Sequence, residues 1–169
     1  GYFFTGSYAT GKYIAERVAG KLVPVGLELG GKDPMYVCED VDVKSTAASG
    51  VEGAFYNNGQ SCCAVERIYV HENIYDEYVA AFVEEAKQMK MGNPTEEGTF
   101  LGSLTRPQQM DVLTDQVADA TAKGGKLILG GSRAERKGFF FKPTVISNAN
   151  HSMKVMMDES FGPIIGIQK

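Results

Sequence analysis

The sequence predicts an α/β fold in which a mostly parallel sheet is flanked by helices. Short apolar segments alternate with longer segments whose apolar residues recur at helical spacing, as in sheets built from strand–helix units. The 169 residues suffice for a sizeable core, and no internal repeat or low-complexity segment stands out. An apolar content of 43%, a charged content of 22% and an aromatic content of 10% are ordinary for a globular protein.

The N-terminal part of the chain contains strands separated by one helix. Residues 3–5 read as the end of a buried strand, and a helix follows through residues 14–19. The apolar run Val23–Leu29 predicts a second strand, and the short run Pro34–Cys38 predicts a third.

Caps and periodicity define the middle of the chain. Asp42 is a suitable N-cap for a helix that runs to Ala54. Residues 67–71 alternate in the manner of a strand, and from Ile74 to Met89 the apolar positions recur at helical spacing. The turn-forming residues 91–94 end that helix.

The C-terminal part begins with a second amphipathic helix. It covers residues 107–122 and is stopped by Gly124 and Gly125. Residues 126–129 and 139–146 read as strands, and so does the apolar run in residues 162–169.

Charge, hydropathy and cysteine content exclude several classes of protein. The net charge is −4 with scattered Lys and Arg, so we expect no nucleic acid as a partner. No apolar run approaches the roughly 18 residues of a membrane span, so we expect no membrane partner. The 3 cysteines make no disulfide framework, and a reducing compartment, the cytoplasm, is the expected location.

Both ends of the chain lie in segments that read as strands. The chain starts at Gly1 without a methionine and stops within an apolar run. Because natural domains usually end in exposed polar linkers, we interpret the chain as a piece of a longer protein.

The run from Phe55 to Ala64 places Cys62 just after a Gly-Gln turn. Such a turn lets the backbone approach a ligand, and we expect the residues after it to open a helix whose N–H groups favour a thiolate. A buried cysteine is more often a small apolar residue, but Asn57, Gly59 and Gln60 are poor choices for a core helix. Cys63 is a competing nucleophile, and the residues alone do not decide between the two thiols.

Glu28 interrupts the apolar segment Val25–Leu29. One interpretation is a strand residue that faces solvent or pairs with Lys32. The other is a buried carboxylate suited to activate water or to accept a thiol proton, with Gly30 and Gly31 supplying backbone freedom.

Two shorter segments suggest contacts with a nucleotide. Gly6 and Ser7, between a strand and a helix, form either a phosphate-binding turn or an ordinary helix cap. In the segment 158–163, two acids adjoin an aromatic residue and a turn. An acid can accept hydrogen bonds from a ribose and a phenyl ring can pack on a heteroaromatic ring, although an ordinary acidic loop has the same composition.

Together these four segments resemble the signatures of the NAD(P)-dependent aldehyde dehydrogenase superfamily. The matching segments are residues 4–7, residues 27–32, residues 55–64 with every fixed position of the cysteine signature, and residues 159–163. They occur in the family's order and with similar spacing, and the resemblance covers essentially the whole chain.

The resemblance implies a reaction and assigns residues to it. Cys62, rather than Cys63, would attack an aldehyde, and the resulting thiohemiacetal would be oxidised to a thioester that Glu28 hydrolyses through an activated water. The cofactor would be NAD or NADP, with no metal, and the substrate a small-molecule aldehyde. The cofactor-binding residues implied are Gly6, Ser7, Leu29, Glu159 and Phe161, with Gln109 as a looser match.

The resemblance also implies a domain division. Residues 1–30 would be the C-terminal remnant of a Rossmann-type cofactor-binding domain, and residues 31–169 a catalytic domain truncated at its C-terminus. The parent enzyme would be a homodimer or homotetramer. An asparagine of the oxyanion hole and a lysine that binds ribose would lie outside the chain, so we expect the chain alone neither to bind NAD tightly nor to oxidise aldehydes.

The sequence is compatible with three alternative functions. An acylating enzyme of the same fold would pass the thioester to coenzyme A and would not need Glu28. A non-catalytic protein would keep the fold for binding or structure. A cysteine hydrolase would need a histidine partner, and His71 and His151 lie in no motif.

Overall fold

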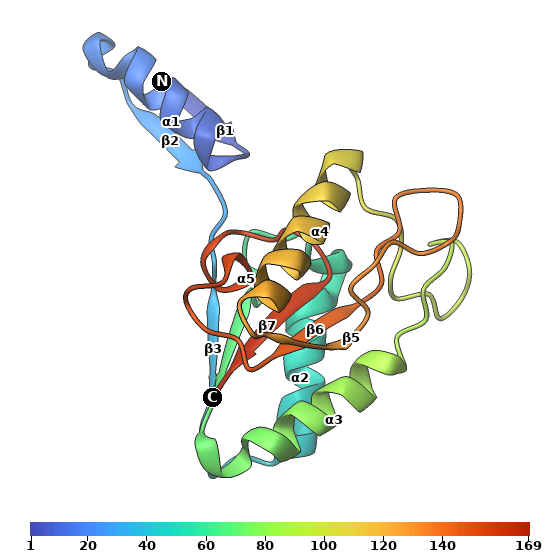
Figure 1. Cartoon of the computed structure of the whole chain (residues 1–169). Helices are drawn as coiled ribbons and strands as arrows, with labels where there is room; N and C mark the ends of the chain where they lie inside the picture. The colour runs from blue at the N-terminus through green and yellow to red at the C-terminus, as the bar shows by residue number, and fades with distance from the viewer. The chain divides into compact units, whose positions relative to one another are not determined.

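The structure, a computed structural model, describes all residues from 1 to 169, and the chain divides into two compact units (Figure 1). The first unit comprises Gly1–Gly31 and the second Lys32–Lys169.

The first unit is a strand–helix–strand motif. Its two strands are parallel and pair from Tyr2 with Val25 to Thr5 with Glu28. The helix between them begins after Ser7, whose side chain accepts a hydrogen bond from the backbone N–H of Thr10. Its elements are β1 (Tyr2–Thr5), α1 (Tyr8–Val18), the 3₁₀ turn η1 (Ala19–Lys21) and β2 (Val25–Glu28).

The second unit contains a five-stranded sheet in the order β3-β4-β7-β6-β5. The first four of these strands run parallel and β5 is antiparallel to β6, which confirms the α/β fold with a mostly parallel sheet. Its strands are β3 (Pro34–Val37), β4 (Arg67–Val70), β5 (Lys126–Leu129), β6 (Thr144–Ser147) and β7 (Ile164–Gln168). Its helices are α2 (Val43–Phe55), α3 (Tyr75–Lys87), α4 (Pro107–Ala122) and α5 (Lys154–Met157), with 3₁₀ turns η2 (Tyr56–Gly59) and η3 (Glu72–Ile74).

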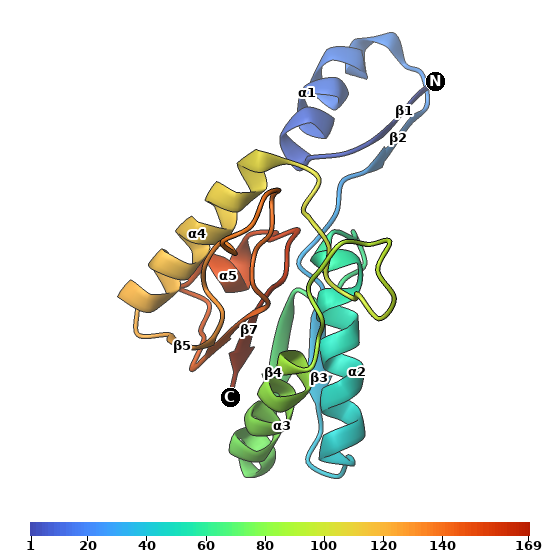
Figure 2. The ribbon, with the colours of Figure 1, turned by 90° about the vertical axis from the view of Figure 1, so that its right-hand side faces the viewer.

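Helices cover both faces of this sheet, with α2 and α3 on one side and α4 and α5 on the other (Figures 1 and 2). Because side chains alternate along a strand, β7 supplies both cores. Ile165 and Ile167 are fully buried in the core with α2 and α3, whereas Ile164 is buried in the core with α4 and α5. Strands buried on both faces explain the continuous apolar runs in the sequence.

One predicted strand is only partly correct. The expected strand over residues 139–146 is restricted to Thr144–Ser147. Pro143 has no N–H to donate to a ladder, and before it Phe141 forms only an isolated bridge to Arg133. No helix of the structure has the length and apolar character needed to cross a membrane.

Candidate functional site

The loop that carries Cys62 follows a tight left-handed turn at the end of α2. Asn57, Asn58 and Gly59 have φ values of 50°, 58° and 70°. Asn and Gly are the residues that adopt this region most readily, because short polar side chains bond locally and glycine has no Cβ. The turn therefore requires the residue types that are unsuited to a core helix.

Side-chain amides attach this turn to the segment before α4. The buried side chain of Asn58 accepts a hydrogen bond from the Gly102 N–H at 2.9 Å. Gln60 Oε1 accepts one from the Thr105 N–H, also at 2.9 Å. These amides thus fix the backbone that leads into Cys62.

The expected helix after Gln60 is wrong. Residues 61–64 form a turn in which the Ala64 N–H donates to the Ser61 carbonyl at 3.2 Å, and the next element is β4. No helix N-terminus follows the cysteine, because the chain goes directly from this turn into the sheet. The helix N-terminus that was expected to favour a Cys62 thiolate is therefore absent from this part of the chain.

The two neighbouring thiols are both exposed and in no disulfide, and they differ in their surroundings. Cys63 Sγ lies 3.2 Å from Ser61 Oγ and lines a hollow of about 340 Å³ on the surface of α2, with Glu52 and Tyr56. Cys62 does not line that hollow. The hollow is therefore lined by Cys63 and not by Cys62, the thiol that the resemblance assigns as nucleophile.

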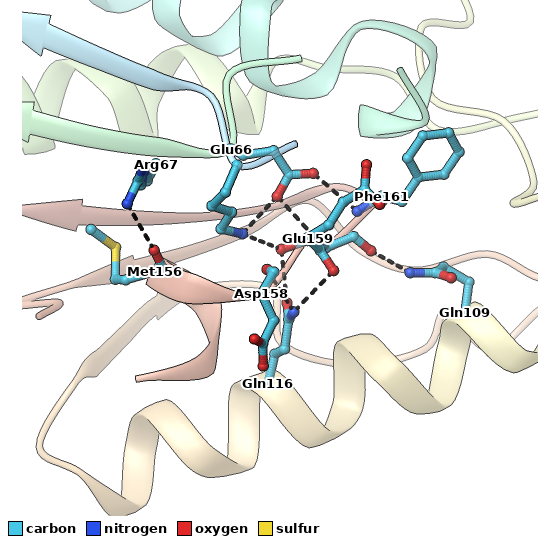
Figure 3. A network of polar contacts seen from close by, with 10 residues as sticks. Glu66, Arg67, Gln109, Gln116, Met156, Asp158, Glu159 and Phe161 are labelled. Atoms are coloured by element: carbon cyan, nitrogen blue, oxygen red, sulfur yellow. Dashed lines mark hydrogen bonds and ion pairs between the residues drawn. The ribbon is translucent and has the colours of Figure 1, made fainter. Parts of the chain in front are cut away.

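The turn containing Glu159 and Phe161 is held by a buried ion pair (Figure 3). The Glu66 carboxylate accepts hydrogen bonds from the backbone N–H groups of Ser160 at 2.9 Å and Phe161 at 3.0 Å. Lys32 Nζ lies 2.6 Å from Glu66 Oε2 and donates to Ser160 Oγ at 2.8 Å. The side chains of Lys32 and Glu66 are 8% and 5% exposed, so the pair is nearly dry.

Burial and pairing act on Lys32 in opposite directions. Removal from water lowers the pKa of Lys32, because it disfavours the charged ammonium, and the nearby Glu66 carboxylate partly offsets this effect. A buried charge without its partner would be strongly destabilising, so the two residues depend on each other.

Residues of α4 complete the network around Ser160. Ser160 Oγ donates to Gln116 Oε1 at 2.8 Å, and Gln116 Nε2 donates to the Asp158 carbonyl at 3.3 Å. Gln109 Nε2 donates to the Ser160 carbonyl (Figure 3). Gln109 thus contacts the turn itself.

The cysteine loop and the Phe161 turn are neighbours within the second unit. A Cβ at Gly59 would collide with the carbonyl oxygen of Gly162, so the two backbones are in direct contact there. Phe161 is 37% exposed and Glu159 is half-buried. The structure therefore brings together the segments of Cys62, Glu159 and Phe161.

The remaining predicted site residues belong to the first unit, where Glu28 is exposed. This agrees with the interpretation of a strand residue that faces solvent, whereas the interpretation of a buried carboxylate is wrong, because the β1–β2 pair leaves the Glu28 side chain in solvent. The alternative pairing with Lys32 is wrong too, since Lys32 pairs with Glu66. Leu29 packs on Gly11, and Gly6 donates its N–H to the Glu28 carbonyl at 3.0 Å. Ser7 caps α1.

Sequence reasoning missed Glu66, Ser160 and Gln116 as parts of the site. Gln116 carried a signal, because it lies one helical turn after Leu113 on the apolar side of α4 and is 2% exposed. A polar residue in such a stripe must have buried partners. The sequence signal for Glu66 was weaker: it is a charged residue directly before strand β4.

A family model described as aldehyde dehydrogenase family matches residues 2–169. The chain belongs to the aldehyde dehydrogenase family. A putative aldehyde dehydrogenase-like protein of Schizosaccharomyces pombe is 41% identical over 167 residues, which are 98% of this chain and 33% of that protein.

Solved aldehyde dehydrogenase structures are similar over nearly the whole chain. A mutant of aldehyde dehydrogenase C of Pseudomonas syringae, complexed with NAD⁺ and octanal, has a TM-score of 0.94 at 32% identity. The alignment covers 98% of this chain and 35% of that one. An E. coli NADP dependent enzyme has a TM-score of 0.94 at 31% identity, covering 98% and 34%. The chain thus spans about a third of the length of the relatives it matches.

Proposed function

We propose that the protein containing this chain oxidises an aldehyde to a carboxylic acid with NAD or NADP, using Cys62 as nucleophile. The observation that carries this proposal is the contact between the cysteine loop and the Phe161 turn, in a chain of this family. Similar proteins, including an aldehyde dehydrogenase complexed with NAD⁺ and octanal, support NAD or NADP as the cofactor and an aldehyde as the substrate.

In the first half of the proposed reaction, the Cys62 thiolate adds to the aldehyde carbonyl. The carbon–sulfur bond forms as the carbonyl π electrons move to oxygen, and the Cys62 backbone N–H would help to stabilise the oxyanion. Bound NAD or NADP would supply the hydride acceptor. When the oxyanion reforms a carbonyl and the C–H bond loses hydride, a thioester on Cys62 remains.

In the second half, Glu28 would take a proton from water. The resulting hydroxide adds to the thioester and the carbon–sulfur bond breaks, which releases the carboxylic acid and the Cys62 thiolate. The proton that Glu28 took from water then returns to the sulfur, and the Cys62 thiol and the Glu28 carboxylate are restored. An exposed carboxylate in the first unit is free of any structural ion pair that would compete with this role. Water as the acceptor distinguishes this reaction from acyl transfer to coenzyme A.

The residues present are chemically suited to the cofactor. Glu159 supplies a carboxylate that can accept hydrogen bonds from ribose hydroxyls, and Phe161 supplies an exposed ring that can pack on nicotinamide. Ser7 and Gly6 lie at the N-terminus of α1, where backbone N–H groups favour phosphate. The Leu29 backbone would contact the carboxamide, and Gln109 acts through its bond to the Ser160 carbonyl.

We also propose the division of labour along the chain that the resemblance implies. Residues 1–30 are the end of a cofactor-binding domain and residues 31–169 are catalytic. The parent protein is a homodimer or homotetramer in the cytoplasm. By this proposal the 169-residue chain alone neither binds NAD tightly nor turns over aldehyde.

The test uses the complete protein that contains this chain, assayed with a panel of aldehydes and either cofactor. Cys62→Ala is expected to abolish aldehyde-dependent reduction of the cofactor, whereas Cys63→Ala and Cys38→Ala retain it. Glu28→Gln should give a burst of one reduced cofactor per active site followed by slow turnover, because the thioester forms and is not hydrolysed. Full activity in Cys62→Ala would refute the proposal, and rapid release to coenzyme A would favour the acylating reaction.

A further inference from the structure

The Glu66 carboxylate is placed to hold the backbone of the Glu159–Phe161 turn. Oε1 accepts from the Phe161 N–H, and Oε2 accepts from both the Ser160 N–H and Lys32 Nζ (Figure 3). All of these groups belong to the second unit. One carboxylate therefore binds two successive N–H groups of one turn.

The backbone at Phe161 needs such an anchor. Its φ of 46° lies in the left-handed region, which a residue with a Cβ occupies only when its surroundings hold it there. Packing of its own ring is a weak support, because the residue is 37% exposed. The hydrogen bonds of Glu66 act on the backbone itself and leave the ring available.

Ser160 is fixed from every side between the two proposed cofactor-binding residues. Its N–H donates to Glu66, its carbonyl accepts from Gln109, and its hydroxyl accepts from Lys32 and donates to Gln116. The residue is fully buried. These hydrogen bonds hold the central residue of the turn in place, and Glu159 and Phe161 are the residues on either side of it.

We propose that Glu66, neutralised by Lys32, is a positioning residue that holds Glu159 and Phe161 in the geometry required for the nicotinamide riboside half of the cofactor. This inference rests on the proposed function, which gives Glu159 and Phe161 their cofactor contacts. The Glu66 carboxylate bonds to Lys32 and to the backbone of the turn, and it takes no part in the chemistry.

The variant that tests the proposal replaces both charges. Glu66→Gln has a single acceptor oxygen for two N–H donors, so at least one bond to the turn is lost. Combining it with Lys32→Met avoids leaving a buried ammonium without a partner, which could unfold the protein. The matched control is Asp115→Asn with Lys154→Met, because this pair has a similar 2.7 Å separation in the same unit but is exposed.

The measurements are made on the complete protein that contains this chain. In Lys32→Met/Glu66→Gln we expect the Kd for NADH or NADPH, measured by fluorescence titration, to rise about tenfold or more. The aldehyde KM and the rate of Cys62 alkylation by iodoacetamide should stay within about twofold of the wild type, and the amides of Ser160 and Phe161 should exchange faster. The control pair should change none of these.

Two outcomes overturn the inference. An unchanged Kd in the double variant would show that the turn is positioned without Glu66. A rise in the cofactor Kd accompanied by an equal fall in the rate of Cys62 alkylation would indicate that Glu66 has a general structural role. The proposed function fails separately, if Cys62→Ala still oxidises aldehydes, and in that case the change in Kd still decides the role of Glu66.

Discussion

Several buried polar side chains in the second unit form one hydrogen-bonded network, whereas 4 buried side-chain atoms, the Tyr78 hydroxyl among them, have no hydrogen-bond partner. Glu66, Lys32, Ser160 and Gln116 share their hydrogen bonds. Tyr78, by contrast, is fully buried between α2 and α3, and its hydroxyl has no hydrogen-bond partner. A buried hydroxyl without a partner has lost its hydrogen bonds to water without forming new ones, which destabilises the folded state.

Tyr78→Phe should therefore stabilise the fold. Loss of the unpaired hydroxyl is expected to raise the free energy of unfolding by about 1 kcal/mol, while the ring stays in contact with Phe82. Urea denaturation of the 169-residue chain at pH 7 measures the change. A loss of stability would mean that the hydroxyl has a partner in solution.

The same residue makes stability depend on pH. Burial raises the pKa of Tyr78 well above its ordinary value of 10.0. Above pH 10 the unfolded tyrosine loses its proton while the folded one keeps it, so the folded state is progressively disfavoured as pH rises. The wild type should lose stability relative to Tyr78→Phe between pH 9 and about 11, and the difference should be constant below pH 9. Parallel curves over the whole range would contradict this assignment.

Phe161 combines backbone strain with a proposed function, and the two can be separated by substitution. Phe161→Gly removes the strain of a left-handed φ of 46° and should raise the free energy of unfolding by up to about 1 kcal/mol relative to Phe161→Ala, which keeps the strain. Both variants lose the ring and should bind the cofactor more weakly. Urea denaturation compares the two, and a less stable glycine variant would show that the turn is not strained.

At the scale of elements, the contact between the turn after α2 and the turn before β7 is the most restrictive. Gly59 has a left-handed φ of 70° and packs against the Gly162 carbonyl, whereas Gly98 has a φ of 75° with open space around it. Gly59→Ala should reduce the free energy of unfolding by at least about 2 kcal/mol, and Gly98→Ala by about 1 kcal/mol. Urea denaturation measures both changes in the free energy of unfolding, and the difference between them gives the cost of the collision between the new Cβ and the Gly162 carbonyl. Equal losses would mean that the two turns move apart easily.

Local signals in the sequence were sufficient for most element boundaries. Helix α4 covers Pro107–Ala122 as predicted, because proline at its start and the glycine pair after its end act within a few residues. Asp42 caps α2 as predicted, with its side chain accepting from the Ser45 N–H. The strand expected from residue 139 failed because β pairing depends on distant partners, which an apolar run does not reveal.

The candidate site was predictable only as far as its motifs are contiguous. Cys62, Glu159 and Phe161 are predicted from short runs of neighbouring residues. The Glu66 network was not, because Glu66 and Ser160 are 94 residues apart and Gln116 and Ser160 are 44 apart. The resemblance to a family also could not give the exposure of Glu28, which depends on packing in this chain.

At the scale of the whole molecule, the two units differ in how much they bury. In the first unit, α1 buries only Gly11 and Val18, and Phe3 and Leu22 are 82% and 94% exposed. Two strands and a helix of this size supply little apolar burial to offset chain entropy. The second unit contains two apolar cores.

Hydrogen exchange of the 169-residue chain should therefore resolve the units. Backbone amides of β1, α1 and β2 are expected to exchange at least about tenfold faster than those of β4 and β7, because the first unit can open without unfolding the second. Mass spectrometry of peptic peptides measures this. Uniform protection across both units would show that they unfold together.

The three successive left-handed residues before Cys62 also limit how this segment can evolve. In a library that varies residues 57 to 59, selection for folding alone should retain mainly Asn and Gly, although none of the three has a proposed chemical role. Part of the cysteine signature would then be required by the backbone conformation rather than by catalysis. A descendant that had lost the thiol and its activity would be expected to keep Asn57, Asn58 and Gly59.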